Sequence, residues 1–337
     1  MRVLHQYPAC PADCGFHRLP HIHSLEAQIL SEEALAHDSP FVGTPKLADW
    51  LSLLKPRVLV LVVYTGVIGL ILAPGHLTLL QSVTAILCIT GAAGACGAIN
   101  MWYDRDIDTV MRRTRNRPIP AGRISPEGAV WFGIILAAIS ILVMGFVLNV
   151  TAALSLLFSV FFYVFIYTVW LKRRTPQNIV IGGAAGALPP VIGWAASTGR
   201  IDLTALVLFG IIFIWTPPHF WALSLWANND YRQAGIPMLP VVSGARETRR
   251  QILLYTLVLV PLSTLPYVLG TSGLPYLVAS LLFGGVFLWR SYQVTVDQQD
   301  ADGVSLTGDL PAKLAFKYSI VYLFALFGAL AVDHWMA

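Results

Sequence analysis

Charged side chains are scarce in this sequence. Of its 337 residues only 12% are Asp, Glu, Lys or Arg, whereas 56% are hydrophobic. Soluble domains usually carry about 25% charged residues. The composition therefore excludes a soluble domain of ordinary type and indicates a chain that lies in a lipid bilayer.

Cysteine is scarce too. Of the four cysteines, Cys88 and Cys96 lie within an apolar run, where small thiols usually pack, so no disulfide framework is expected. Cys10 and Cys14 stand among four histidines, which could indicate metal ligation. Without a second cysteine pair, a chance cluster in a polar segment is the simpler interpretation.

Residues 1–45 lack a long apolar run, so no cleaved secretory signal is evident. We interpret them as a polar, mobile tail and residues 46–337 as one transmembrane domain. A short amphipathic helix from Leu47 to Arg57 is expected on the membrane surface, leading into the first span at Pro56.

Nine apolar windows of about 20 residues with few or no charges follow one another along this domain. They cover 57–74, 79–101, 129–149, 151–171, 178–198, 202–226, 252–270, 273–291 and 315–333. The predicted fold class is therefore an all-α integral membrane protein with about nine transmembrane helices.

The basic residues predict the orientation of these helices. Short loops rich in Lys and Arg stay in the cytoplasm. With the N-terminus inside, the inner loops carry nearly all of the basic residues and the outer connections carry only Arg200. We expect a cytoplasmic N-terminus and an outer C-terminus. Since topology accounts for the basic residues, the net charge of +4 gives no indication of a nucleic-acid partner.

Two long polar inner loops, 102–128 and 227–251, indicate a functional inner face. The first begins with Asn100, Asp104 and Asp108 at the end of a span. On a continuous helix these residues drift only about 40° per four-residue step and share one face. Their carboxamide and carboxylate oxygens suit Mg²⁺, which commonly binds one or two carboxylates together with substrate phosphates. Asp106 is expected to point elsewhere.

Arginines follow this acidic motif closely. Planar guanidinium groups grip phosphate oxygens well, so the motif and the arginines together favour a Mg²⁺-diphosphate site. In the alternative interpretation, the aspartates only neutralise the arginines in a solvated loop. A proton or cation pathway would instead place the acids in mid-span. The arginines are Arg112, Arg113, Arg115, Arg117 and Arg123.

His219 is an ionisable residue within the sixth apolar window, which makes it a candidate functional residue. The equally weighted alternative is a neutral histidine hydrogen-bonded to a neighbouring helix. On a continuous helix, His219 and Asp230 would face the same way.

The short loop after the fourth window contains Lys172 and Arg173, which are candidates for anion binding. The same charges would also arise from topology alone. In the window that follows, Gly182, Gly183 and Gly186 predict close packing between helices.

These motifs resemble the intramembrane prenyltransferases of the UbiA type. The shared features are N-x-x-x-D-x-x-x-D after the second span, Y-T-x-x-L-K-R after the fourth and an Asp-bearing loop after the sixth. The strings L-K-R-R-T-P-Q-N, W-T-P-P-H-F-W-A-L and D-Y-R-Q-A-G-I-P-M-L-P-V-V are more selective and are similar to those of the protohaem IX farnesyltransferases. The resemblance runs from about Leu47 to the last span.

The resemblance implies a helical bundle with a central cavity and a cytoplasmic cap built from the two polar loops. The implied reaction is transfer of the farnesyl group of farnesyl diphosphate to a vinyl group of haem b, giving haem O and diphosphate, with Mg²⁺ as cofactor. Membrane lipid would surround the protein. Haem A synthase or assembly factors of terminal oxidases are implied as protein partners.

The resemblance also assigns roles to residues. Asn100, Asp104 and Asp108 would hold Mg²⁺-diphosphate, and Asp230 would belong to a second aspartate site. Asp104, Asp108 and Asp230 would be catalytic. The cationic residues Arg112, Arg113, Arg117, Lys172 and Arg173 would contact phosphate, and His219 or Tyr231 would serve the haem side. Many members have D-x-x-x-D in the second loop. Here the position four before Asp230 is Trp226, so a complete second carboxylate pair is absent. Substitution by Asn229 as a neutral ligand stays open as the alternative to a haem-side role for His219 and Tyr231.

Two other functions stay open at this point. Prenylation of a quinone precursor such as a hydroxybenzoate would use the same donor site with another acceptor. A transporter of an anionic amphiphile would leave the spacing of the acidic motif unexplained. The tail is acidic and poor in arginine, unlike most mitochondrial transit peptides, so the bacterial inner membrane is favoured over the mitochondrial inner membrane.

Overall fold

The computed structural model describes residues 44–301 and 303–336, and all helices named below lie in this part of the chain. By contacts the chain divides into Met1–Val42 and Gly43–Ala337, and the description concerns the second unit. The predicted Cys and His cluster, and all of the predicted tail except its last two residues, lie outside the described residues.

The described residues contain eight helices that are long and apolar enough to cross a membrane, or nine when the bent pair α2–α3 counts as one span. The predicted all-α membrane fold with about nine spans is confirmed. The spans are α2 (Leu47–Leu53) with α3 (Pro56–Leu72), α4 (Leu79–Tyr103), α6 (Pro126–Val147), α7 (Val150–Phe161) with the π-helix η1 (Phe162–Leu171), α8 (Asn178–Ala187) with α9 (Pro189–Thr198), α10 (Leu203–Trp226), α13 (Gly244–Leu262) with α14 (Leu265–Val268), α15 (Leu274–Thr295) and α16 (Leu310–Met336).

The first span is entered through a sharp corner. Helix α2 ends at Leu53, four residues before the predicted end, and meets α3 at 54°. Lys55 takes a left-handed conformation in the corner, with φ 54°. Pro56 then starts α3, a position where proline's missing N–H has no helical partner to lose. The corner directs the Lys55 side chain toward the interior of the bundle.

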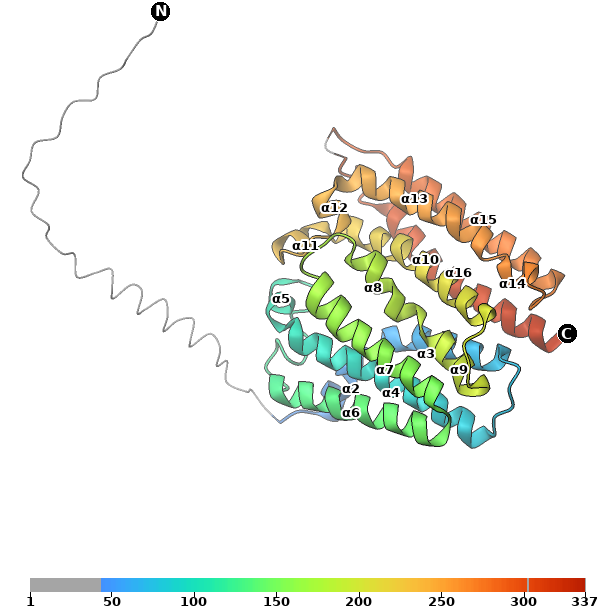
Figure 1. Cartoon of the computed structure of the whole chain (residues 1–337). Coiled ribbons are helices and arrows are strands. Elements are labelled where there is room, and N and C mark those ends of the chain that lie inside the picture. Colours follow the sequence, from blue (N-terminus) through green and yellow to red (C-terminus); the bar gives the residue numbers. More distant parts are fainter. Residues whose placement is uncertain (1–43, 302, 337) are drawn as a thin grey trace, which may run out of the picture. The chain divides into compact units, whose positions relative to one another are not determined.

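The helices pack in an order that differs from their order in the chain (Figure 1). Helices α4 and α6 pack together at one side, α13 and α15 pack at the other, and α3, α9, α10 and α16 lie between them. The largest buried cluster joins α3, α10 and α16 with α13 and α15, around Ile211, Tyr322 and Phe327. On the outer helices, large side chains such as Phe146 and Leu282 are exposed. Exposed apolar faces of this kind are expected of helices that meet lipid.

Glycines set the closest helix approaches. A Cβ on Gly69 would lie 2.1 Å from the carbonyl oxygen of Pro190, so α3 and α9 meet backbone to backbone. A Cβ on Gly182 would lie 2.2 Å from the ring of Tyr167, and one on Gly183 would lie 3.0 Å from Thr216. The packing role predicted for Gly182 and Gly183 is confirmed.

For Gly186 the packing prediction is wrong. A Cβ at this position would have nothing within 4 Å, so no neighbour requires a glycine there. The window 178–198 is also not one helix, because Leu188 separates α8 from α9 and Pro189 begins the second helix. Gly186 lies two residues before Leu188, at a point where no neighbouring helix approaches its backbone closely.

Both polar loops lie at the same end of the bundle, which we call the polar-loop face. It is the end at which α3 begins and α4 and α10 finish. The first loop carries the short helix α5 (Arg105–Val110), and the second carries α11 (Asn228–Gln233) and α12 (Leu239–Val242).

Candidate functional site

The predicted acidic motif lies where α4 meets the first polar loop. Helix α4 ends at Tyr103, and Asp104 takes φ −89° and ψ 9°, a sparsely populated region common in active sites. Backbone hydrogen bonds of 2.9 Å still join Asp104 to Asn100 and Asp108 to Asp104. The expected uninterrupted helix is therefore wrong, because the chain bends at Asp104, but the four-residue register survives the bend.

Burial separates the motif's members as the register predicts. Asn100 is 3% exposed, Asp104 is fully buried and Asp108 is 2% exposed. The carboxylate of Asp106 is instead 59% exposed. Buried carboxylates are rare unless they are paired or bind a metal. Asn100, Asp104 and Asp108 are thus the members whose environment requires a partner.

Asp104 receives hydrogen bonds from two other elements. Nδ2 of Asn100 donates to Oδ2 of Asp104 at 2.7 Å, and the ammonium of Lys172 donates to the same oxygen. Lys172 follows η1, so this contact joins the loop after the fourth span to the end of the second. The other oxygen, Oδ1, is buried and has no hydrogen-bond partner among the described residues. Arg173 approaches it only to 3.7 Å.

Asn100 is held by two residues that the sequence interpretation missed. Lys55, in the corner before α3, donates to Oδ1 of Asn100. Nδ2 of Asn100 also lies 3.2 Å from the hydroxyl of Thr168. The available signal for Lys55 was a lysine directly before the proline that starts the first span. For Thr168, inside an aromatic apolar run, no signal was present.

Arg173 ties the exposed side of the motif together. Its guanidinium donates to both oxygens of Asp106, at 2.6 and 2.7 Å, and to the carbonyl of Tyr103 at 3.1 Å. It also lies 4.9 Å from the ring centroid of Tyr103. Although burial acts to raise the pKa of Asp106, hydrogen bonding to Arg173 holds that pKa below its ordinary value. Arg173 thus orders the loop beside Asp104.

Asp108 is paired within its own loop. Arg117 donates to Oδ2 of Asp108 at 2.6 Å, and the hydroxyl of Thr114 donates to the carbonyl of Asp108 at 3.1 Å. Both contacts fold the segment after α5 back toward the motif. A carboxylate and a guanidinium therefore meet side by side, which is an arrangement suited to a metal-bound phosphate.

The second polar loop docks on the first. Ile107 and Met111 of the first loop share a buried cluster with Tyr231, Ile236 and Met238 of the second. This apolar contact brings Asp230, which is half-buried, to the same region as the acidic motif.

Charged residues of both polar loops act on the pKa of the Tyr231 phenol. Burial raises the pKa of the Tyr231 phenol, and the Arg113 guanidinium opposes that shift from nearby. Lys172 and Asp230 also act on this group. Asn228, which was not predicted, has a buried side-chain oxygen with no hydrogen-bond partner among the described residues. The second loop therefore presents Asn228, Asp230 and Tyr231 on a single turn of helix.

His219 lies apart from this cluster. Its ring is stacked between Trp215 and Phe316, with centroid distances of 4.4 and 4.6 Å. Nδ1 lies 2.6 Å from the hydroxyl of Ser319 on α16. That hydroxyl donates to the carbonyl of Phe316, so it accepts from Nδ1 and leaves Nε2 as the acceptor nitrogen.

The two expectations for His219, its hydrogen bond and its shared helix with Asp230, have different outcomes. A hydrogen bond to a neighbouring helix, the alternative interpretation of His219, is present. The continuous helix from His219 to Asp230 is wrong, because α10 ends at Trp226 and α11 starts at Asn228.

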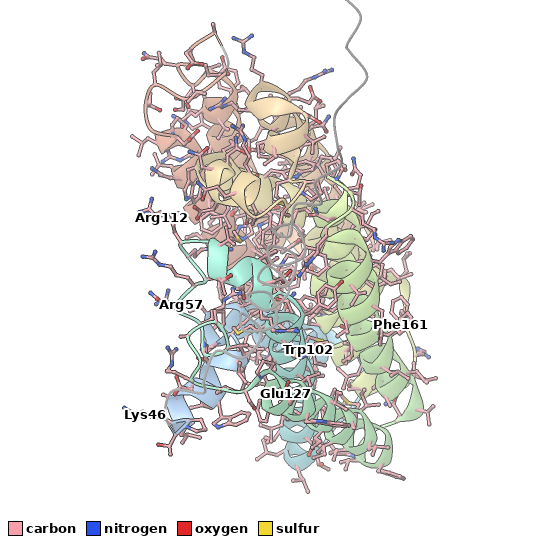
Figure 2. The ribbon with its side chains drawn as sticks, turned by 90° about the vertical axis from the view of Figure 1, so that its left-hand side faces the viewer. Lys46, Arg57, Trp102, Arg112, Glu127 and Phe161 are labelled. Carbon is pink, nitrogen blue, oxygen red and sulfur yellow. The ribbon has the colours of Figure 1, made fainter. Side chains whose placement is uncertain are left out.

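Arg112 has a different setting from the paired cations. It is exposed, and Figure 2 shows it along one edge of the molecule with Arg57 and Lys46. Of the predicted phosphate-binding residues, Arg117, Lys172 and Arg173 thus contact the buried acidic motif directly. Arg112 and Arg113 lie at its exposed margin.

The donor atoms fit a hard divalent cation. No three His, Cys, Asp or Glu side chains of the described residues converge tightly enough to form a complete metal site by themselves. Mg²⁺ typically takes only one or two carboxylates and completes its shell with water and substrate phosphate. Asp104 Oδ1, which is buried without a hydrogen-bond partner, is a donor atom of this kind. The oxygen of Asn100 accepts from Lys55, and its amide nitrogen faces Asp104. The ligand set of Asn100, Asp104, Asp108 and Asp230 stays a prediction, because its three carboxylates do not come together as one group in the described residues.

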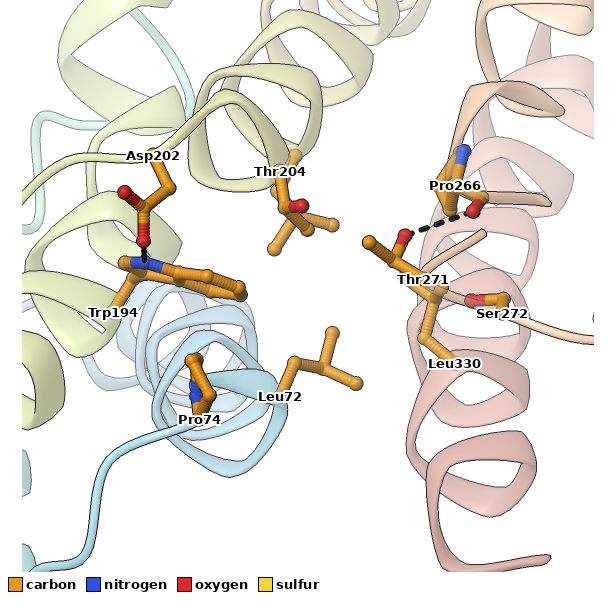
Figure 3. A pocket seen from close by; sticks show the side chains of 10 residues that line it. Leu72, Pro74, Trp194, Asp202, Thr204, Pro266, Thr271, Ser272 and Leu330 are labelled. Atoms are coloured by element: carbon orange, nitrogen blue, oxygen red, sulfur yellow. Dashed lines mark hydrogen bonds between the residues drawn. The ribbon is translucent and has the colours of Figure 1, made fainter. Parts of the chain in front are cut away.

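A cavity of about 320 Å³ lies at the opposite end of the bundle (Figure 3). Its wall includes Leu72 at the end of α3, Leu330 near the end of α16, and Trp194, whose indole N–H donates to Asp202 at 3.0 Å. None of the predicted site residues lines it. This cavity is therefore separate from the candidate functional site.

Solved structures of other proteins share this fold. A digeranylgeranylglyceryl phosphate synthase matches with a TM-score of 0.71 at 18% identity, covering 86% of this chain and 99% of that chain. A UbiA homolog from Archaeoglobus fulgidus, bound to DMAPP and Mg²⁺, matches with a TM-score of 0.61 at 18% identity, covering 84% and 99%. At these identities the likeness concerns the fold.

Sequence comparison finds relatives of much higher identity. The chain is 64% identical over 286 residues to a protein from Acidiphilium cryptum named Protoheme IX farnesyltransferase, covering 85% of this chain and 90% of that protein. A protein of the same name from Granulibacter bethesdensis is 60% identical over 294 residues, covering 87% and 93%. The model of the UbiA prenyltransferase family matches residues 61–320. The chain belongs to the UbiA prenyltransferase family.

Proposed function

We propose that this chain transfers the farnesyl group of farnesyl diphosphate to a vinyl group of haem b, producing haem O and diphosphate. The observation that carries the proposal is the 64% identity to a Protoheme IX farnesyltransferase along 90% of that protein. The buried acidic motif, with cationic side chains around it, supports the diphosphate half of the reaction.

The polar-loop face binds the diphosphate. Asn100, Asp104, Asp108 and Asp230 would hold Mg²⁺, which would supply Lewis-acid stabilisation of negative charge on the diphosphate. Lys55 and Lys172, held beside Asn100 and Asp104, lie where their ammonium groups can turn to phosphate oxygens. Arg117 does the same beside Asp108. Cations positioned before the reaction stabilise the charge that develops as the bond breaks.

The farnesyl chain extends from this face into the apolar interior. The bond between its first carbon and the bridging oxygen breaks, and the electron pair leaves with diphosphate. The π electrons of the haem vinyl group form the new carbon–carbon bond. Water then adds to the resulting cation and loses a proton, which completes the hydroxyethylfarnesyl side chain. Tyr163 and Tyr167, with ring centroids 5.3 Å apart on η1, contribute to an aromatic surrounding that limits early quenching by water.

The haem is assigned to the side of α10 and the second loop. His219, fixed between two aromatic rings, keeps Nε2 free of its contact with Ser319. Tyr231, in the second loop, packs against Ile107 and Met111 of the first. These residues would hold the acceptor while the first loop and its cations hold the donor.

The polar-loop face is assigned to the cytoplasm, because it carries the basic loops. The membrane is assigned as the bacterial inner membrane. Haem A synthase or terminal-oxidase assembly factors, which use related haem chemistry, are the proposed protein partners.

The test uses purified protein with farnesyl diphosphate, haem b and Mg²⁺, with pigments resolved by mass. Formation of haem O is the expected result, and chelation with EDTA should abolish it while readdition of Mg²⁺ restores it. A parallel reaction offers hydroxybenzoate with labelled farnesyl diphosphate. Binding of both substrates without haem O, or prenylation of hydroxybenzoate alone, would refute the proposal.

A further inference from the structure

A pocket lined by basic residues lies on the polar-loop face, away from the acidic motif. Its volume is about 590 Å³, and it lies between the start of α13 and the connection from α15 to α16. Three arginines from adjacent turns of α13 line it, together with a hydroxyl and an amide. The lining side chains are Arg246, Arg249, Arg250, Leu253, Thr295, Asp297 and Gln299.

Arg249 makes this pocket a built site. The side chain is 2% exposed and donates to the carbonyl of Gly303 at 2.7 Å and to Asp309 at 3.2 Å. It also lies 3.6 Å from Asp297. Its Nε is buried and has no hydrogen-bond partner among the described residues, and neither has the buried side-chain oxygen of Gln299. Native proteins rarely leave such groups unsatisfied.

The charges in the pocket favour an anion. Three guanidinium groups and one carboxylate, that of Asp297, line the pocket. Arg249 offsets one of the two carboxylates that approach it, and Asp297 also accepts from the Thr307 hydroxyl at 2.7 Å. The Arg246 guanidinium donates to two backbone carbonyls, at 3.0 and 3.2 Å, and these neutral acceptors do not offset its positive charge. Arg250 meets Glu247 at 3.6 Å, with both side chains largely solvated, which offsets little.

The surroundings place the pocket at the level of lipid headgroups. Trp289 and Tyr292 of α15, one to two turns from Thr295, are 57% and 46% exposed. Exposed Trp and Tyr side chains concentrate at membrane interfaces. Leu254 and Leu257 of α13 are also exposed on the membrane side of the arginines. A ligand in the pocket would therefore meet apolar surface directly beside the cationic groups.

We propose that the pocket of Arg246, Arg249 and Arg250 binds the phosphate of an anionic phospholipid, whose acyl chains lie along α13 and α15. Basic pockets between transmembrane helices on the cytoplasmic side bind headgroups of this class. Guanidinium groups from neighbouring turns suit the phosphate oxygens. The bound lipid would fasten the connection from α15 to α16 against the start of α13. This inference does not depend on the chemistry of the acidic motif.

The test measures lipid binding by the full-length protein in detergent. Phosphatidylglycerol and phosphatidylcholine are titrated separately, and retained lipid is counted by native mass spectrometry while the melting temperature is recorded. Phosphatidylglycerol is expected to bind at least tenfold more tightly and to raise the melting temperature. The variant Arg246→Ala/Arg250→Ala should bind it about 25-fold more weakly, since each arginine near a membrane surface contributes roughly a fivefold factor. Arg249 is left intact because its removal would bury unpaired carboxylates.

Matched variants distinguish this site from general surface charge. Arg57→Ala/Asn116→Asp lowers the charge of the polar-loop face by the same two units at exposed positions outside the pocket, and should keep phosphatidylglycerol affinity within about twofold. Arg246→Lys/Arg250→Lys keeps the charge and should restore most of the affinity. Equal losses in the pocket variant and the control would overturn the proposal. So would full displacement of the lipid by millimolar inorganic phosphate, which would identify a site for free anions.

Discussion

Asp104 joins two segments of the chain, because its buried carboxylate lies between Asn100 of α4 and the loop after η1, from which Lys172 donates and Arg173 approaches. A buried carboxylate is expensive without partners, so these contacts fix where the end of α4 must lie. They also leave Oδ1 without a hydrogen-bond partner in the described part of the chain. The residue is thus both a structural junction and the strongest candidate to hold a metal.

Asp104→Asn and Asp108→Asn test this dual role. Each replacement keeps the side-chain shape but removes an anionic ligand, so farnesyl transfer to haem should fall by at least about 100-fold. Membrane insertion, checked by yield and melting temperature, should persist. Glu127→Gln removes an exposed carboxylate at the start of α6 and should leave activity unchanged. Full activity in both aspartate variants would contradict the assignment.

Lys55 makes a second test at this scale. The ammonium contacts Asn100 from outside the acidic motif, so it can reach a diphosphate without belonging to the predicted sequence pattern. Lys55→Met should raise KM for farnesyl diphosphate by roughly tenfold or more, the cost of one charge-assisted hydrogen bond. Lys46→Met changes an exposed lysine of the same segment and serves as the control. An unchanged KM would mean that Lys55 holds Asn100 in place but does not contact farnesyl diphosphate.

At the scale of elements, glycine spacing decides how closely α3 and α9 approach. A Cβ on Gly193 would lie 2.2 Å from the carbonyl oxygen of Gly66, a contact that only backbone movement could relieve. Gly193→Ala should therefore destabilise the protein by about 1–3 kcal/mol, as overpacking usually does. Thermal unfolding in detergent measures this loss.

Gly186→Ala is the matched control, because a Cβ there would meet nothing within 4 Å. In a helix the replacement should be neutral or stabilising, by up to about 1 kcal/mol. Equal destabilisation by both replacements would mean that helix flexibility, rather than the close approach of α3 and α9, explains the glycines.

The sequence predicted these elements better than it predicted their junctions. Apolar runs are long enough to locate each span, because a bilayer requires about 20 such residues. The bend at Asp104 and the end of α10 at Trp226 depend on tertiary contacts that no local pattern contains. The same holds for Lys55, which reaches Asn100 only because its left-handed backbone turns the chain into α3. Spacing alone therefore located the acidic motif but not all of its partners.

At the scale of the whole molecule, the two polar loops act as one cap. Ile107 and Met111 pack with Tyr231, Ile236 and Met238, although Met111 and Tyr231 are 120 positions apart in the sequence. The four helices between them return the chain to the same end of the bundle. This arrangement concentrates the basic residues on a single face, and that asymmetry determines how the protein should insert.

Cysteine labelling in intact cells tests the orientation. In a chain with Cys10 and Cys14 replaced by Ser, Asn116→Cys lies in the first polar loop and His76→Cys lies in the connection between α3 and α4 at the opposite end. Neither position is Lys or Arg, so the charge asymmetry that directs insertion stays intact. A membrane-impermeant maleimide should label only the His76→Cys protein, and permeabilisation should expose the Asn116→Cys protein as well. The reverse pattern would place the diphosphate site outside the cytoplasm. It would contradict the orientation predicted from the charge distribution.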